Sequence, residues 1–490
     1  MQRINLKKEP CLDAKHQSFA YQIKALKAIQ DAEYAAVFHE QGLGKSKIAI
    51  DLMLYWLERK EVDTVLFVVK KGLIANWQSE LIKHTHMTPK VLTQSRNANF
   101  FVFNSPARLM LAHYEVLKSE QERFQLFLKS RNVGAILDES TKIKNPTSAI
   151  TKSLFLLAPL FKKRIIMTGT PIANRPFDIW AQIYFLDQGK SLGETFPEFK
   201  RHANLTNSLS ENRQEQDEFE RYLGEIFGRI SGFTVRETKN SNVIALPNKT
   251  IRKVVCEWER NQYVLYAQIQ KEMRATVIKN GVPTQDDSDE ILKRMLRLVQ
   301  VASNPKLIDE GYTGAPGKVE HLMDIVEDIC RKNQKCIVWT SFTQNADWLS
   351  QELTRYGTKK VHGKMNMDRR DAGINAFLHQ DNVRVLVTTP GAAKEGLTLT
   401  VANHVLFYDR TFSLDDYLQA QDRIHRISQT RECFVYDFIM KESIDEWVDL
   451  LLECKMLAAQ LTQRDISIGY YKNRMSYDFG TIIRNILNIK

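Results

Sequence analysis

The sequence predicts two doubly wound α/β domains, because short apolar runs and helical segments alternate along both halves of the chain. The runs are continuously apolar and rich in β-branched and aromatic residues, a pattern typical of parallel strands that helices cover on both faces. Helical patterns such as residues 46–59 and 373–380 separate them. At 490 residues the chain is also too long for a single core. The expected strands cover residues 35–39, 64–69, 100–104, 134–138 and 164–169 in the first half, and residues 335–341, 383–389, 404–409 and 433–439 in the second.

Two polar segments interrupt this alternation. Residues 187–235 are helix-prone, and residues 279–290 lie early in the second half. Both are typical of helical insertions or linkers attached to the two cores. We therefore expect a first domain over residues 1–242, a second over residues 243–455, and a basic helical tail over residues 456–490.

Composition narrows the class of protein. The chain has 69 basic and 58 acidic residues and a net charge of +11, an excess that favours a polyanionic partner, although solubility alone also explains it. No stretch reaches about 18 apolar residues without a charge, so we expect no membrane span. The first residues lack the apolar segment of a secretory signal. The six cysteines are scattered without a C-x-x-C pair, which argues against a zinc ribbon or disulfide framework and favours a reducing cytoplasm.

Residues 35–50, AAVFHEQGLGKSKIAI, predict a strand, a glycine-bearing turn and the start of a helix. Gly42 and Gly44 allow a tight turn whose backbone N–H groups point at phosphate oxygens, and the helix dipole adds to the attraction. Lys45 would then reach the β- and γ-phosphates, and the Ser46 hydroxyl would bind Mg²⁺. The usual first glycine of a phosphate loop is missing, so a chance Gly-Lys-Ser turn is the alternative; the strand before and the helix after favour the phosphate loop.

Asp138 and Glu139 follow the apolar run at residues 134–138. Acidic residues at the end of a strand can hold a metal ion, activate a water molecule or cap the next helix. A nucleotidase with a phosphate loop needs a second acidic element at a neighbouring strand end. The metal and water roles are therefore favoured, with Asp138 for Mg²⁺ and Glu139 for the attacking water.

Further segments complete an ordered set of motifs. Residues 39–46 read HEQGLGKS, residues 138–145 read DESTKIKN, and residues 167–174 read MTGTPIAN. Residues 233–250, FTVRETKNSNVIALPNKT, form a connector, and residues 419–430 read QAQDRIHRISQT. In this order the segments resemble motifs I, II and III, the connector and motif VI of the Snf2 family, within the superfamily 2 helicase-like ATPases, in the compact form typical of bacterial or bacteriophage members.

The resemblance implies two RecA-like doubly wound lobes with helical insertions, an ATP site between them, and ATP and Mg²⁺ as cofactors. Because Arg423 and Arg426 are three residues apart, we expect both on one helix face, where they would stabilise charge on the γ-phosphate. The implied catalytic residues are Lys45, Asp138, Glu139, Arg423 and Arg426, the implied metal ligands are Ser46 and Asp138, and the implied nucleotide-binding residues are Gln22, Gly42, Leu43, Gly44, Lys45, Ser46, Gly396 and Gln419.

DNA, double-stranded, forked or branched, is the partner that the resemblance implies, held through its phosphates. The implied contacts are Lys71, Asn76, Lys142, Lys144, Thr168, Ser341, Phe342, Thr389 and Lys394. For each lysine a solvated surface position is the alternative. We expect Trp77 and Trp339 in the core beside strands, with stacking on bases as the alternative.

Motif II departs from the family at two positions, where Ser140 and Thr141 replace alanine and histidine. In the family this histidine bridges motif II to motif III and transmits nucleic-acid occupancy to the ATP site. A threonine hydroxyl also donates and accepts a hydrogen bond, but over a shorter reach. How DNA is coupled to hydrolysis is therefore the open question of this sequence.

The leading hypothesis is an ATP-hydrolysing, DNA-stimulated motor that translocates on DNA and remodels forks, junctions or protein–DNA complexes. A branch-migrating or strand-separating helicase is the close alternative. A DNA-binding protein with a decayed ATPase fold is the third, and the intact Lys45, Asp138 and Glu139 argue against it. We expect a monomer in a bacterial or host cytoplasm, or in the nucleus if the source is eukaryotic.

Overall fold

The computed structural model describes residues 9–172, 174–204, 213–241, 246–280, 288–393 and 398–474. The chain forms two compact units. Lobe 1 comprises Met1–Asn204, Phe219–Ala245 and Thr462–Asp465, and lobe 2 comprises Leu205–Glu218, Leu246–Leu461 and Ile466–Lys490. No helix within the described ranges combines the length and apolar character needed to cross a membrane.

Lobe 1 is built on a parallel sheet, whose described strands follow the order β3-β4-β2-β5-β6-β1-β7. The strands are β1 (Tyr34–Val37), β2 (Thr64–Val69), β3 (Lys90–Val91), β4 (Leu109–His113), β5 (Val133–Asp138), β6 (Lys163–Met167) and β7 (Thr234–Val235). The central strands are almost completely buried. This burial explains why their sequences are continuously apolar.

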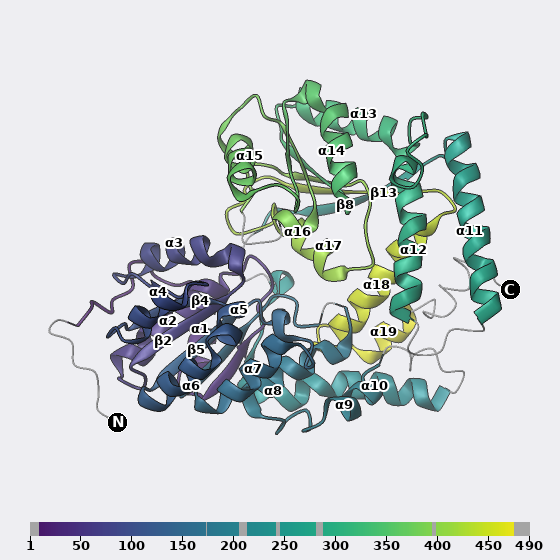
Figure 1. Ribbon diagram of the computed structural model, residues 1–490. Helices are drawn as coiled ribbons and strands as arrows, with labels where there is room; N and C mark the ends of the chain where they lie inside the picture. Colours follow the sequence, from purple (N-terminus) through teal and green to yellow (C-terminus); the bar gives the residue numbers. More distant parts are fainter. Residues whose placement is uncertain are drawn as a thin grey trace. The chain divides into compact units, whose positions relative to one another are not determined.

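Helices cover the sheet of lobe 1 (Figure 1). They are α1 (Ala20–Ile29), α2 (Lys45–Glu58), α3 (Ile74–His84), α4 (Arg96–Phe103), α5 (Tyr114–Ser119), α6 (Gln121–Ser130), α7 (Ala149–Leu157), α8 (Ile179–Asp187), α9 (Phe196–His202) and most of α10 (Arg213–Ile230). Helix α2 is buried over most of its length, and its Trp56 packs with Phe67 of β2 and Ile136 of β5 in one core cluster. The helix that follows the phosphate loop is therefore held rigidly by the core.

Lobe 2 repeats this plan with a parallel sheet in the order β10-β11-β9-β12-β13-β8. Its strands are β8 (Lys249–Cys256), β9 (Cys336–Trp339), β10 (Thr358–Val361), β11 (Val385–Thr388), β12 (His404–Phe407) and β13 (Cys433–Met440). Its helices are α11 (Arg260–Asn280), α12 (Ser288–Ser303), α13 (Lys318–Arg331), α14 (Thr343–Glu352), α15 (Met367–His379), α16 (Pro390–Ala393), α17 (Leu414–Gln421), α18 (Ile444–Thr462) and α19 (Ile468–Arg474). Two parallel α/β sheets confirm the predicted fold class.

One predicted strand, at residues 100–104, is wrong, because residues 100–103 belong to helix α4 and Asn104 is its C-cap. The side chain of Ser95 caps this helix by accepting a hydrogen bond from the backbone N–H of Ala98. Phe103 is buried against α6, whereas Phe100 and Phe101 are exposed. The preference of aromatic residues for strands depends on context, and here the cap and the burial of one face of the segment favour a helix. The neighbouring strand is instead β4.

The connector begins as part of lobe 1. Its strand β7 pairs with β1, and the backbone N–H of Phe38 donates to the carbonyl of Val235. Arg236 then donates to the carbonyl of Phe38, 2.9 Å away, and forms an ion pair with Asp465. The segment that enters the phosphate loop is thus held from its outer side by the connector.

Candidate nucleotide-binding site

The phosphate loop joins β1 to α2 and depends on two glycines. Gly42 and Gly44 have φ values of 84° and 67°, in the left-handed region that other residues rarely adopt. A Cβ on Gly44 would lie 2.3 Å from Nε2 of Gln22. Helix α2 begins at the next residue, so its first N–H groups face the loop, an arrangement suited to binding phosphate.

Lys45 folds back across this loop. Its Nζ donates to the carbonyl oxygens of His39 and Glu40, at 3.0 and 3.3 Å, and the side chain is buried. Burial, with the Lys45 charge as the next cause, lowers the pKa of His39 to about 4. The imidazole is therefore neutral at physiological pH, and the ammonium of Lys45 has no competing positive charge from it.

The first turn of α1 packs directly on the phosphate loop. The hydroxyl of Tyr21 donates to the carbonyl of Leu43 at 2.9 Å, and Nε2 of Gln22 lies 3.4 Å from the carbonyl of Gly44. Oε1 of Gln22 accepts from the backbone N–H of Phe19. The predicted nucleotide-binding residues of lobe 1 therefore lie together, on the phosphate loop, at the start of α2 and on α1. They are Gln22, Gly42, Leu43, Gly44, Lys45 and Ser46.

Asp138 is the last residue of β5 and is held by three hydrogen bonds. Its Oδ2 accepts from Nε1 of Trp77 at 2.7 Å, its Oδ1 accepts from the N–H of Glu139 at 3.0 Å, and its carbonyl accepts from the hydroxyl of Tyr114 at 2.8 Å. Burial and then the nearby Glu139 raise the pKa of Asp138 to about 6, while Trp77 and Lys45 act in the opposite direction. A carboxylate whose charge is this costly is a strong candidate for binding a cation.

Glu139 adopts a strained backbone conformation, with φ of 50°. Its Oε1 accepts from Nε2 of Gln41 at 3.0 Å, whereas Oε2 is buried without a hydrogen-bond partner among the described residues. Gln41 belongs to the phosphate loop and lies against Gly169 of motif III, where a Cβ would come within 2.7 Å of it. Motifs I, II and III therefore meet at one side chain.

The helix-cap alternative for motif II receives no support. The element after Glu139 is a short 3-10 turn, η2 (Ser140–Ile143), and the Glu139 side chain makes no capping hydrogen bond to it. Asp138 and Ser46 instead supply one carboxylate and one hydroxyl. This donor set suits Mg²⁺, which is usually held by one or two carboxylates together with phosphate oxygens and water.

Three supporting residues were not assigned to the site from the sequence: Gln41, Trp77 and Tyr114. The expectation that Trp77 lies in the core is confirmed, since the side chain is 1% exposed, but its bond to Asp138 was not anticipated. The available signal was that a buried indole N–H needs an acceptor. Trp339 is equally buried, as expected.

The predicted DNA contacts of lobe 1 differ in accessibility. Lys71 and Asn76 are exposed, on η1 (Lys71–Leu73) and α3, while Thr168 is fully buried at the end of β6. Lys142 pairs with Glu115 at 3.2 Å, and Lys144 pairs with Asp178 at 3.3 Å. These positions do not test binding of DNA, and all five contacts stay predictions.

The predicted residues of lobe 2 lie near the ends of its strands. Ser341 and Phe342 follow β9, and the N–H of Ser341 donates to the buried carboxylate of Asp409 at 2.7 Å. Thr389 follows β11 and is buried. Lys394 and Gly396 lie outside the described residues.

The expectation that Arg423 and Arg426 share a helix face is wrong. Helix α17 ends at Gln421, and both arginines lie in the turns that follow. Nε of Arg426 donates to the carbonyl of Asp422 at 2.7 Å, and its Nη1 donates to the hydroxyl of Thr398 at 3.1 Å. Arginine side chains near the end of a helix can bond to its terminal carbonyls, as Arg426 does here to the C-cap residue Asp422. Gln419, on α17, is buried and donates to Asp415.

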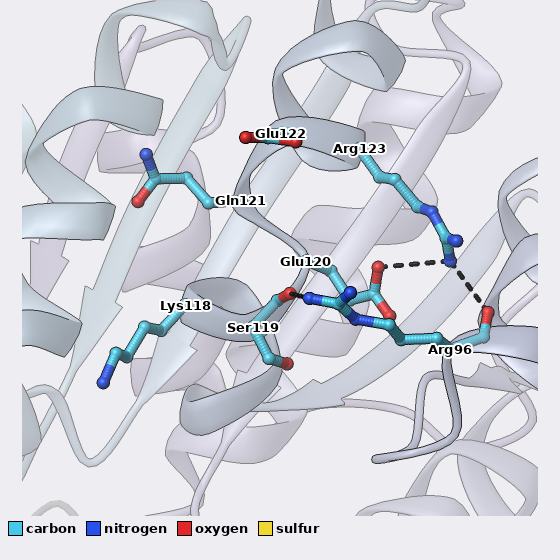
Figure 2. A pocket seen from close by; sticks show the side chains of 7 residues that line it. All are labelled: Arg96, Lys118, Ser119, Glu120, Gln121, Glu122 and Arg123. Carbon is cyan, nitrogen blue, oxygen red and sulfur yellow. Dashed lines mark hydrogen bonds and ion pairs between the residues drawn. The ribbon is translucent and has the colours of Figure 1, made fainter.

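A separate hollow of about 460 Å³ lies between α4 and the start of α6 (Figure 2). Its lining residues are Arg96, Lys118, Ser119, Glu120, Gln121, Glu122 and Arg123. Arg123 pairs with the buried Glu120 at 3.2 Å and donates to the carbonyl of Arg96 at 2.8 Å. The hollow contains none of the predicted site residues, and its central charges already satisfy each other.

Comparison with known proteins agrees with the motif order. A model of the SNF2-related domain matches residues 21–307, and a model of the helicase conserved C-terminal domain matches residues 317–428. A putative ATP-dependent helicase/translocase of Bacillus subtilis is 27% identical over 443 residues, which cover 86% of this chain and 45% of that protein. An uncharacterized ATP-dependent helicase of Mycoplasma genitalium is 26% identical over 449 residues, which cover 87% of this chain and 40% of that protein.

More distant relatives include an ISWI chromatin-remodeling complex ATPase of Arabidopsis thaliana, 25% identical over 84% of this chain and 39% of that protein. The chain thus spans less than half the length of these curated relatives. Among solved structures, the SWI2/SNF2 ATPase core of Sulfolobus solfataricus in complex with dsDNA is 24% identical, with a TM-score of 0.43 and coverage of 99% of this chain and 100% of that one. Because the SNF2-related model alone matches more than half of its residues, the chain belongs to the SNF2-related family of helicase-like ATPases.

Proposed function

We propose that this chain is an ATP-hydrolysing motor that DNA stimulates, and that it translocates on double-stranded DNA and remodels forks, junctions or protein–DNA complexes. The observation that carries the ATPase part is the contact of Gln41 with both Glu139 and Gly169, which brings the phosphate loop and motifs II and III together in lobe 1. Membership of the SNF2-related family supports the choice of ATP.

The residues of lobe 1 would have different roles at the phosphates of ATP. The N-terminus of α2 and the ammonium of Lys45, which now rests on two carbonyl oxygens, would bind the β- and γ-phosphates. Asp138 and Ser46 would hold Mg²⁺, which neutralises phosphate charge when bound. Oε2 of Glu139 has no hydrogen-bond partner in the described part of the chain and would orient the attacking water, while Gln41 fixes the other oxygen. Arg423 and Arg426 stay predictions for stabilising charge on the γ-phosphate.

DNA as the partner rests on the Snf2-type motifs and connector and on the net charge of +11. The relatives named as ATP-dependent helicases favour strand separation or branch migration as a second candidate. We propose that the chain acts as a monomer in the compartment that holds DNA, which is a bacterial or host cytoplasm, or the nucleus if the source is eukaryotic. The proposal concerns this chain, since it matches less than half the length of these relatives.

Removal of either charged group at the centre of the site tests the ATPase assignment. Lys45→Ala removes the phosphate-binding ammonium, and Glu139→Gln keeps the shape of the side chain but not its charge. Each variant is expected to lose at least about 100-fold in steady-state ATP turnover, the scale for one group that stabilises developing charge. Binding of labelled duplex DNA should survive in both. Turnover at the wild-type rate in either variant would remove the assigned mechanism.

The nucleic-acid substrate is tested by ATP turnover on a panel of duplex, forked and single-stranded DNA and RNA. We expect duplex or forked DNA to stimulate most, with strand products measured in the same reactions to separate translocation from unwinding. If about six phosphates are neutralised, the logarithm of the binding constant for duplex DNA should fall against the logarithm of salt concentration with a slope of about −5. Stimulation by RNA alone would contradict the proposal.

The bond from Trp77 to Asp138 predicts a change in pH dependence. The indole N–H stabilises the carboxylate and so lowers its pKa; Trp77→Phe should raise that pKa above the present value of about 6. Since the charged form is needed to bind the cation, activity should be lost at a higher pH as the solution is acidified. We expect the acid limb of the kcat/KM profile, which reports the free enzyme, to move up by about one pH unit, the size of one charge-assisted hydrogen bond.

Trp339→Phe is the matched control. This tryptophan is as buried as Trp77, but it lies in lobe 2 and its indole N–H has no hydrogen-bond partner among the described residues. Its acid limb should remain in place. Equal shifts in the two variants would mean that loss of core packing, and not the bond to Asp138, moves the profile.

A further inference from the structure

Ser140, the residue after Glu139, makes a hydrogen bond that the family motif does not provide. Its side chain is completely buried, and its hydroxyl donates to Oε1 of Gln182 at 2.7 Å. Gln182 lies on α8, 42 residues further along the chain, and is also completely buried. The alanine that the family has at position 140 could not form this bond.

The amide of Gln182 continues the connection to motif III. Its Nε2 donates to the carbonyl of Pro171 at 3.0 Å and to the carbonyl of Asp178 at 2.9 Å. Pro171 lies within the MTGTPIAN segment of motif III. A single side chain therefore joins motif II to motif III, and every atom of the connection lies in lobe 1.

The direction of these bonds is unambiguous. Both backbone carbonyls can only accept, so the NH₂ group of Gln182 must face them and its oxygen must face Ser140. The two N–H groups and the oxygen of the amide are then all satisfied, and the hydroxyl of Ser140 must donate. A buried polar pair that is fully satisfied holds one geometry, because any rotation would leave a donor or acceptor unpaired.

This geometry bears on the strained residue beside it. Glu139 keeps its left-handed backbone only if its surroundings hold it. Gln41 holds its side chain, and the bond from Ser140 to Gln182 anchors the next residue. The carboxylate of Asp178, near the start of α8, also pairs with Lys144 of motif II. A displacement of motif III would therefore shift α8 and, through it, the position of Glu139.

We propose that the Ser140–Gln182 pair is a positioning link that couples motif III to Glu139 in this chain, in place of the histidine that Thr141 replaces. The inference rests on the proposed function, because it assigns a path by which DNA at motif III alters ATP hydrolysis. Both side chains are completely buried, so we assign them an indirect role through Glu139. Their loss should change the response to DNA more than the strength of DNA binding.

The test compares Ser140→Ala, Gln182→Leu and the double variant with the wild-type protein. ATP turnover is measured without DNA and across a duplex DNA titration. Each single variant should lower the ratio of DNA-stimulated to DNA-free kcat by about fivefold, the scale of one buried hydrogen bond, with the half-saturating DNA concentration within about twofold of wild type. The double variant should lose no more than the single ones, because the three changes break one link.

Ser153→Ala is the matched control. Ser153 is also a buried serine of lobe 1 whose hydroxyl donates to a glutamine oxygen, that of Gln121, but it lies on α7, outside the motifs. Its stimulation ratio should equal that of wild type even if its melting temperature falls as far as that of Ser140→Ala. Equal ratios in the two variants would overturn the inference.

Two further results separate the possible failures. If Ser140→Ala does not fold, the double variant provides the measurement. It replaces the polar pair by apolar groups of similar volume and leaves no buried donor or acceptor of the pair itself. A wild-type ratio of DNA-stimulated to DNA-free kcat in the double variant would overturn the inference. If the wild-type protein itself shows no ATP turnover, the proposed function fails. Normal stimulation of the wild type together with an unchanged ratio in the variants rejects the link alone.

Discussion

The parallel pairing of β5, β6 and β1 is the constraint on which the candidate site depends. In this register Asp138 lies opposite Met167, and Met167 lies opposite Val37. Because parallel strands end at the same edge of a sheet, the three loops that follow these residues must emerge side by side. They are the phosphate loop, motif II and motif III. A different strand order would separate the same sequences, whatever their side chains.

Bringing three polar loops together has an electrostatic cost, which is seen in the raised pKa of Asp138. Burial favours the protonated form of this carboxyl group, and the neighbouring Glu139 adds to the effect. The donors from Trp77 and the backbone only partly offset the loss of water. Lys45 is the opposite charge whose effect reaches Asp138. The site is therefore prepared for cationic ligands, since a cation that binds there recovers energy that folding left unsatisfied.

Two neutral amides hold motif II from different sides. Gln41 bonds to the side chain of Glu139, and Gln182 bonds to the hydroxyl of Ser140. Neutral groups fix position without adding charge beside the carboxylates, so the pKa of Asp138 is set by burial, Glu139, Trp77 and Lys45. This arrangement also accounts for the left-handed backbone of Glu139, a conformation that persists only where several contacts hold it.

Local patterns in the sequence were sufficient for the fold class, for most strands and for the phosphate loop, because apolar runs and glycine turns express their structure over a few neighbouring residues. They failed at residues 100–104, where burial on one side selects a helix, and at Arg423 and Arg426, where α17 ends earlier than the spacing suggests. Local sequence patterns could not identify the residues that hold motif II in place. Trp77 lies 61 residues from Asp138, and Ser140 lies 42 residues from Gln182. Such pairs meet only after the strand order has been set, because no local pattern records which loops will become neighbours.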